Sequence, residues 1–239
     1  MTGRNLEAAL VVKTLERLHA RVGERFPEAG IAAVCADLVK VSRTTARRAR
    51  RNARPQLLIR TVVLLILAGV VALGVELWTL GLIPRTLTLQ ADPVALAQGL
   101  ESSVNLLILA GAAVWFLLGW EERAKRARAL ADLHELRSFA HVIDMHQLTK
   151  DPTLILGRSG QATPSSPKRE MSRFELTRYL DYCAEMLSLI GKLAALYAEH
   201  THDARVVDAV NDVENLTTDL GRKIWQKITI LSALDETAA

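Results

Sequence analysis

The stretch LLIRTVVLLILAGVVALGVELWTLGLIP, residues 57–84, carries only two charged side chains, Arg60 and Glu76. A second stretch, SSVNLLILAGAAVWFLLGW, residues 102–120, carries none. A helix rises about 1.5 Å per residue and needs roughly 20 apolar residues to cross a bilayer core about 30 Å thick. Both stretches reach that length. The sequence therefore predicts an all-α integral membrane protein whose two spans form a transmembrane helical hairpin.

The overall composition is ordinary, and the distribution of the apolar residues is what sets the class. The 239 residues are 50% hydrophobic and 23% charged, with a formal net charge of +4. Outside the two stretches the chain is polar and poor in the aromatic and turn residues that strands need. The excess of arginine, with a calculated pI near 9.3, favours a negatively charged neighbour such as a membrane surface.

Basic residues flank the two stretches on one side only. The connecting segment, residues 83–101, has a single cation, Arg85, beside Asp92 and Glu101. The positive-inside rule then predicts a multi-pass protein of the bacterial inner (plasma) membrane, with both termini in the cytoplasm. The cations on the cytoplasmic side are Arg43, Arg47, Arg48, Arg50, Arg51, Arg54 and Arg60 before the first span, and Arg123, Lys125, Arg126 and Arg128 after the second.

The cysteines and the N-terminus agree with that orientation. The first apolar run begins far beyond the 15–30 residues of a secretory signal peptide, so none is expected. Cys35 and Cys183 both fall on the reducing side of the membrane, where structural disulfides are rare. We expect both to be small core residues.

Apolar residues spaced three and four apart predict helices outside the spans. The N-terminal rows are Val11, Leu15, Leu18 and Val22, then Ile31, Val34, Leu38 and Val41. The predicted organisation is N-terminal cytosolic helices with a basic juxtamembrane cluster (1–54), a first transmembrane helix (55–84), a short external loop (85–101), a second transmembrane helix (102–120), a cytosolic stalk helix (121–150), a flexible linker (151–171) and a C-terminal cytosolic helical hairpin (172–239).

The second span is expected to continue into the cytosol as one helix. Asp92 and Pro93 suit its N-cap and first turn, and nothing clearly stops it before about Leu148. The stalk carries a coiled-coil-like row, and Ser172 with Glu175 forms a capping-box pattern at the start of the C-terminal hairpin. The apolar rows are Leu133, Leu136, Ala140 and Ile143 in the stalk; Leu176, Leu180, Cys183, Leu187, Ile190, Ala194 and Tyr197; and, after a second N-cap candidate at Asp203, Val206, Val210, Val213, Thr217, Leu220, Ile224, Ile228 and Leu231.

Ionisable residues within the spans are the first functional candidates, because such groups are uncommon in hydrocarbon. Arg60 and Glu76 are 16 residues apart, as are Asn105 and Glu121, so an antiparallel hairpin can set Arg60 beside Glu121 and Glu76 beside Asn105. The pairs then fix the register of the hairpin. The alternatives are an ion pathway through Glu76 and Glu101, or a boundary effect in which Glu76 snorkels.

Two further groups of polar residues have competing interpretations. The stalk residues His141 and Asp144 are weak candidates for metal ligands, and they need further ligands from another helix or subunit. A solvated or helix-pairing face and a pH-responsive histidine group are the alternatives. The basic cluster sets the topology and attracts anionic lipids, whereas nucleic-acid binding lacks interleaved aromatic residues. The cluster consists of Arg43, Arg47, Arg48, Arg50, Arg51 and Arg54.

No phosphate-binding loop, zinc-protease, nucleophile-elbow or C-x-x-C signature is present in the sequence. The sequence therefore predicts a non-enzymatic protein without a cofactor or metal. No motif assigns it to a family, and its layout alone resembles two-span proteins with cytosolic helices, a group that includes pore-forming effectors of bacterial defence systems. We expect an oligomerising scaffold or regulatory subunit, which binds copies of itself or an unidentified protein through its cytosolic helices. The alternative is a homo-oligomeric channel or pore lined by the second span.

Overall fold

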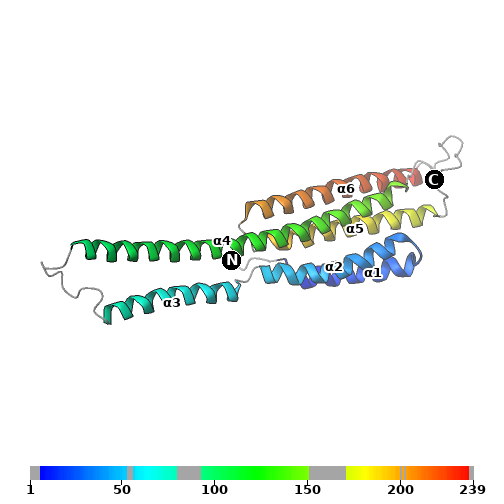
Figure 1. Cartoon of the computed structure of the whole chain (residues 1–239). Helices are drawn as coiled ribbons and strands as arrows, with labels where there is room; N and C mark the ends of the chain where they lie inside the picture. The colour runs from blue at the N-terminus through cyan, green and yellow to red at the C-terminus, as the bar shows by residue number, and fades with distance from the viewer. Residues whose placement is uncertain are drawn as a thin grey trace, which may run out of the picture. The chain divides into compact units, whose positions relative to one another are not determined.

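The structure, a computed structural model, describes residues 6–52, 56–79, 93–150, 171–199, 201 and 203–236. Within these ranges every regular element is an α-helix and no strand occurs, which confirms the all-α prediction (Figure 1). In chain order the helices are α1 (Ala8–Arg25), α2 (Gly30–Asn52), α3 (Leu57–Thr79), α4 (Pro93–Leu148), α5 (Arg173–Ala198) and α6 (Ala204–Glu236).

The chain divides into two compact units, and α4 contributes to both. We call residues 54–125 the apolar unit, and residues 1–53 with 126–239 the bundle unit. Residues 80–84 of the predicted first span, residues 85–92 of the predicted external loop and residues 151–170 of the predicted linker lie outside the described ranges. The helix α4 runs without interruption from Pro93, so the expected continuation of the second span beyond residue 120 is confirmed as helix.

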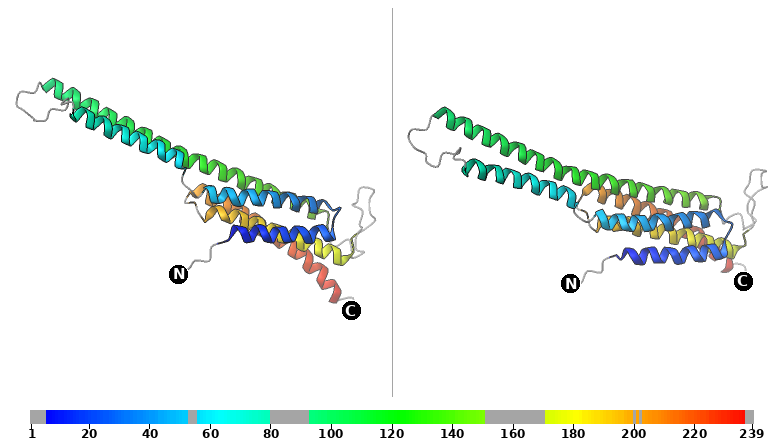
Figure 2. Two further views of the ribbon diagram at one scale, coloured as in Figure 1. Left: turned by 90° about the horizontal axis from the view of Figure 1, so that it is seen from below. Right: turned by 60° about the horizontal axis from the view of Figure 1, so that its bottom comes forward.

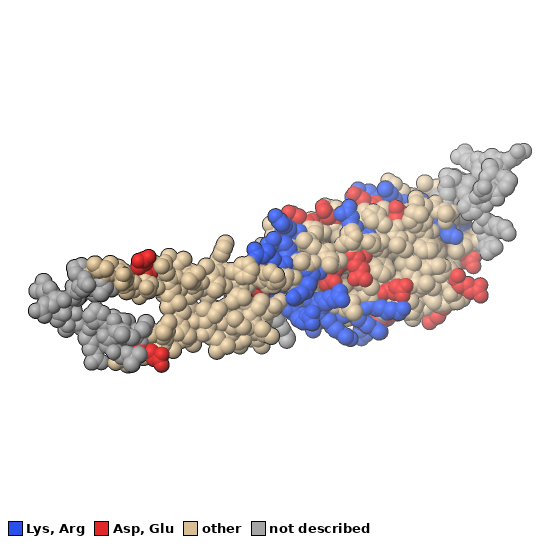
Figure 3. Space-filling view, in the orientation of Figure 1, with Lys and Arg blue, Asp and Glu red and all other residues tan. Residues whose placement is uncertain are grey.

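In the apolar unit, α3 and the N-terminal half of α4 are long and apolar enough to cross a membrane. None of the residues in the most apolar part of either helix is buried. Leu58 is 76% exposed and Trp115 is 81% exposed. On the face shown in Figure 3, most of the surface of this unit is uncharged, with small acidic patches. A helix that is apolar on all sides is typical of a protein core or of a membrane span, and the described residues form no core over the apolar parts of these two.

The bundle unit packs α1, α2, α5, α6 and the C-terminal part of α4 around one hydrophobic core. α5 contacts α6, α1 and α2, and α1 also contacts α2. The views in Figures 1 and 2 agree that α1 and α2 run antiparallel, as do α5 and α6. The predicted C-terminal hairpin is therefore present. Its inner face at Gly191 lets α6 approach closely, because a Cβ there would lie 3.0 Å from Oγ1 of Thr217.

Four of the five predicted apolar rows are buried in full. They are the rows of α1, α4, α5 and α6, from Val11 in the first to Leu231 in the last. Helices with one apolar face owe most of their stability to burying that face, so the spacing of these residues suffices to place them.

The row predicted for α2 is only half right. Val34 and Val41 are half-buried at the flank, and the buried face runs instead through Cys35 and Ser42. Ser42 can be buried because its hydroxyl donates a hydrogen bond of 2.8 Å to the carbonyl oxygen of Val39. The full buried face of α2 is Ile31, Cys35, Leu38, Ser42, Thr45 and Ala49, with Ala32 and Val39 beside it.

The helix starts follow the predicted capping residues where these are described. Ser172 Oγ accepts a hydrogen bond of 3.3 Å from the backbone N–H of Glu175, and the Glu175 carboxylate accepts one of 2.7 Å from the N–H of Ser172. The Asp203 carboxylate accepts a hydrogen bond of 3.1 Å from the N–H of Arg205 in the first turn of α6. The capping candidate Asp92 lies outside the described residues.

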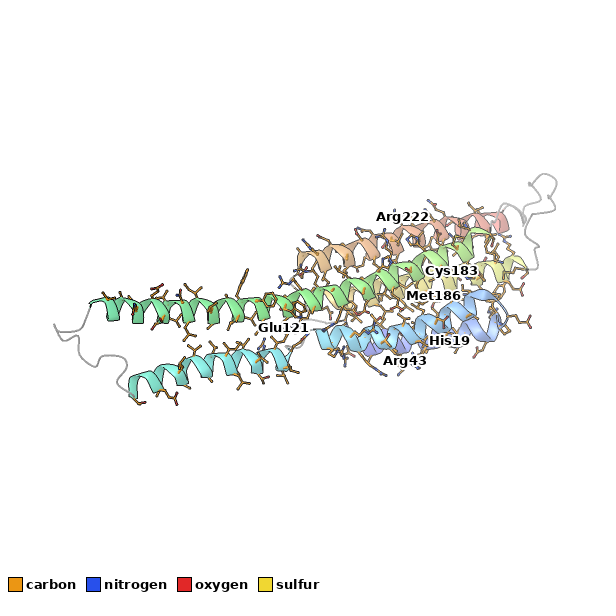
Figure 4. All side chains as sticks on the ribbon, in the orientation of Figure 1. His19, Arg43, Glu121, Cys183, Met186 and Arg222 are labelled. Carbon is orange, nitrogen blue, oxygen red and sulfur yellow. The ribbon has the colours of Figure 1, made fainter. Side chains whose placement is uncertain are left out.

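Both cysteines are free and buried, as predicted. Burial raises the pKa of the Cys35 thiol to about 11 and that of the Cys183 thiol, whose α5 position is labelled in Figure 4, to about 12. Raised values of this kind mark inert core thiols, because only the thiolate reacts.

We expect neither thiol to react with a disulfide reagent at pH 8 in the folded chain. At pH 8 a thiol of pKa about 11 is ionised only to about one part in a thousand. After denaturation both of the chain's 2 cysteines should react. A spectrophotometric thiol titration of the detergent-solubilised chain, before and after denaturant, measures this. Fast modification of either thiol in the folded chain would contradict the packing of α2 or α5.

Candidate functional site

The basic cluster of α2 divides into paired and unpaired arginines. Arg43 donates hydrogen bonds of 3.0 and 2.7 Å to a carboxylate oxygen of Glu16 on α1. Arg48 donates one of 2.5 Å to Asp132 on α4. No carboxylate among the described residues pairs with the remaining members, Arg47, Arg50 and Arg51, and Arg54 lies outside the described ranges.

A shallow groove of about 460 Å³ runs between α1 and α2 beside the unpaired arginines. Lys13 of α1 also lines it, and no ion pair involves Lys13 within the described chain. Figure 3 shows Lys and Arg side chains gathered over these two helices, and Figure 4 labels Arg43 at the edge of α2. We call this the α1/α2 groove, and its lining residues are Ala8, Ala9, Val12, Lys13, Glu16, Arg43, Ala46, Arg47 and Arg50.

Both cationic and small apolar side chains line the groove. Glu16 is its one acidic lining residue, and Arg43 neutralises it. Lys13, Arg47 and Arg50 are left as uncompensated charges beside alanine and valine. The sequence predicted the arginines of this site, but neither Lys13 nor the groove, because the contribution of α1 depends on how α1 packs against α2.

A second groove, between α5 and α6, has a different character. It measures about 480 Å³ and carries both signs of charge, including Glu214. Its cations have partners: Lys192 donates a hydrogen bond of 2.7 Å to Ser188 Oγ, and Arg222 pairs with Asp219 at 3.1 Å. This groove therefore has no excess of unpaired positive charge to offer an anion.

Asp132 is a buried carboxylate that the sequence analysis missed. Its side chain on α4 is 5% exposed, and its two oxygens accept hydrogen bonds from Arg48 at 2.5 Å and from the Tyr197 hydroxyl at 2.6 Å. Burial, and after it the hydrogen bond to Asp132, raises the pKa of Tyr197 above its ordinary value. Asp132 thus links α2, α4 and α5. The available signal was an acidic residue directly before Leu133 of the apolar row.

Further polar contacts fasten the bundle unit. Lys227 of α6 donates hydrogen bonds of 2.5 and 3.0 Å to the side chain and backbone oxygens of Gln147 on α4. Arg126 of α4 donates one of 2.5 Å to Asp203, the residue that caps α6. These side chains position helices, and none is left directed at an open cavity.

Among the residues predicted to pair across the two apolar helices, Glu121 has defined side-chain contacts. Figure 4 labels it on α4, where it is buried. Its carboxylate accepts a hydrogen bond of 2.9 Å from the backbone N–H of Gln56, just before α3, and pairs with Lys125 at 2.6 Å. Arg60 lies close enough for its charge to act on Glu121. The start of α3 is therefore held beside Glu121, in the register that the sequence spacing favours.

The other members of the set have no such contacts. Glu76 on α3 is exposed, and so are Glu101 and Asn105 on α4. In the described part of the apolar unit, no hydrogen bond joins Glu76 to Asn105. The pairing of Glu76 with Asn105 and the ion pathway through Glu76 and Glu101 stay predictions.

The stalk histidines do not gather into a cluster. His141 is exposed, and Asp144 accepts a hydrogen bond of 2.5 Å from the side chain of Gln147. His146 lies against Gly30 of α2, where a Cβ would come within 2.7 Å of the imidazole. A search of the described residues finds no three His, Cys, Asp or Glu side chains grouped to hold a metal ion. His141 and Asp144 gain no third ligand within this part of the chain.

Comparison with known proteins gives this chain no relative. No protein-family model, no curated protein and no solved structure matches it. A functional conclusion therefore depends on the geometry and chemistry of its own residues.

Replacing Tyr197 by Phe should lower the free energy of unfolding by about 1.5–3 kcal/mol, the usual value of a hydrogen bond to a charged group. The change strips one donor from the buried Asp132 carboxylate and leaves the ring packing intact. Arg48→Gln is the matched control, because Arg48 bonds to the other carboxylate oxygen of Asp132. The Arg48 side chain is 54% exposed, so we expect a loss below about 1 kcal/mol. Urea titration of the full chain in mild detergent, followed by helical circular dichroism, measures both. Equal losses would contradict the assignment of Tyr197 as the buried partner.

Proposed function

We propose that this chain is a membrane-anchored, non-enzymatic helical scaffold or regulatory subunit. In this proposal α3 and the N-terminal half of α4 cross the inner membrane as a hairpin, and both termini are cytoplasmic. The bundle unit oligomerises or holds a protein partner. The expected non-protein partners of the chain are the lipid bilayer and its anionic lipids.

The observation that carries the proposal is that no residue is buried in the most apolar window of α3 or of α4. Burying an aliphatic side chain is worth about 1.5–3 kcal/mol, and α3 alone leaves Leu58, Leu64 and Leu65 more than 60% exposed. A core helix of a water-soluble protein would be covered by its own chain, yet no residue in either apolar window is buried. Hydrocarbon is the environment that removes this cost, and a helix satisfies its backbone hydrogen bonds there without outside partners.

The scaffold role is supported by what the polar residues of the bundle do. Asp132, Gln147 and Asp203 are engaged in contacts between helices. These contacts join α2, α4, α5 and α6 to one another. A helix bundle held on a membrane suits the presentation of surfaces to other proteins.

The topology can be tested with single cysteines introduced at Ala91, Ser165 and Ala239. We expect a membrane-impermeant maleimide applied to intact cells to label position 91, and positions 165 and 239 only after lysis. The native Cys35 and Cys183 should stay silent because they are buried. Labelling of position 165 from outside intact cells would refute the orientation.

A homo-oligomeric pore is the second candidate, and the exposed carboxylates favour it. Glu76 lies on α3 and Glu101 on the N-terminal part of α4, segments in which most exposed side chains are apolar. An ionisable group in hydrocarbon faces protein or a water-filled cavity, because exposure to lipid costs several kcal/mol. The described part of the chain supplies no cover for either group, so other subunits would have to supply it.

Glu76→Gln and Glu101→Gln separate the two candidates. A scaffold should assemble almost normally with either variant, and Glu76→Leu should weaken helix pairing by only about 1 kcal/mol. If the chain forms a pore, either substitution should change the ion flux into proteoliposomes, while the mass of the nanodisc-extracted oligomer stays the same. Glu122→Gln is the matched control, because this α4 carboxylate is 68% exposed and lies beyond residue 120. Wild-type flux abolished by either variant, with assembly intact and the control unaffected, would overturn the scaffold in favour of the pore.

A further inference from the structure

The α1/α2 groove has the chemistry of an anion site with an apolar wall. We propose that it binds the phosphate headgroup of an acidic membrane lipid, with Lys13, Arg47 and Arg50 as its ligands. The inference rests on the proposed membrane anchoring and deepens it, because it names the lipid class and the residues that recognise it.

Charge is the first step of the argument. The pairing of Glu16 with Arg43 cancels the acidic lining residue, and Lys13, Arg47 and Arg50 keep their charges without a carboxylate partner in the described chain. Three cations from two helices facing one groove attract a group that carries at least one full negative charge. Charge-assisted hydrogen bonds from arginine suit the tetrahedral oxygens of a phosphate.

The apolar lining residues of the groove favour a lipid over a free phosphate ion. The side chains of Ala8, Ala9, Val12 and Ala46 line the groove beside the cations. They give no hydrogen bond to a phosphate, but their small size leaves room for the glycerol and the first methylenes of a lipid. Inorganic phosphate would gain nothing from these residues.

Position along the chain supports the same ligand. Arg50 precedes Leu57, the first residue of α3, by seven positions. Seven residues span at most about 25 Å even when fully extended. If α3 enters the bilayer at its N-terminal end, Arg50 lies within that reach of the headgroups.

Arg51 distinguishes a defined groove from a diffuse basic surface. It neighbours Arg50 and is exposed, yet it does not line the groove. A surface that attracts acidic lipids by net charge alone would treat Arg50 and Arg51 alike, and it would give little weight to Lys13 on another helix. Binding in the groove instead requires Arg50 and Lys13 to contribute to lipid affinity and Arg51 not to contribute.

The test is lipid binding to the full chain in nonionic detergent, measured by native mass spectrometry with added phosphatidylglycerol or phosphatidylcholine. We expect the wild type to retain phosphatidylglycerol in preference. Lys13→Gln, Arg47→Gln and Arg50→Gln should each weaken retention about fivefold, the factor that corresponds to about 1 kcal/mol per cation. Arg51→Gln should leave retention unchanged. Circular dichroism of each variant checks that the helices are intact.

Two further arms identify the source of the phosphate. Ala9→Trp fills the groove without changing its charge and should abolish retention of phosphatidylglycerol. Inorganic phosphate at millimolar concentration should not compete with the lipid. Equal effects of Arg50→Gln and Arg51→Gln, no effect of Lys13→Gln, or retention unchanged by Ala9→Trp would each overturn the proposal. Competition by inorganic phosphate would assign the groove to the free ion instead. If these variants do not change lipid retention while the labelling experiment gives the expected topology, the proposed lipid site is refuted and the proposed membrane anchoring is not.

Discussion

Within the described residues nothing covers the apolar parts of α3 and the N-terminal half of α4, and this is the constraint on which the rest of the molecule depends. These segments leave almost all of their described leucines exposed, whereas every helix of the bundle unit buries one face. One helix, α4, meets both conditions within 56 residues. Up to Trp120 none of its described residues is buried, and from Ala129 onward one face is buried at spacings of three and four. The change from an exposed apolar surface to a buried apolar face thus occurs within a single uninterrupted helix.

That change explains why charged residues concentrate where they do. Glu121 is buried and holds both the N–H of Gln56 and the ammonium of Lys125. Arg126, five residues after Glu121, bonds to the cap of α6, and Asp132 bonds to α2 and α5. A buried carboxylate without such partners would be strongly destabilising. The polar contacts along α4 therefore anchor neighbouring segments within each unit, one after the other.

The helices and most of the core were predictable because burial of an apolar row needs only periodicity. The core of α2 was not, since Cys35, Ser42 and Thr45 replace larger apolar residues there, and a buried hydroxyl satisfied by its own helix leaves no mark on hydropathy. The role of Asp132 was equally hidden, because its donors Arg48 and Tyr197 are 84 and 65 residues away. Contacts of that separation depend on the packing of helices, which a single sequence does not give.

The basic cluster shows how one run of arginines can serve two purposes. Arg43, Arg47 and Arg50 are four and three residues apart, so they share one face of α2, the face that lines the groove. Arg48 and Arg51 are each displaced by about 100° from a neighbour on that face. Arg48 consequently meets Asp132 in the bundle, whereas Arg47 and Arg50 stay unpaired beside α1. The topology prediction needs only the total charge, but helical geometry separates Arg48, which bonds to Asp132, from the arginines that line the groove.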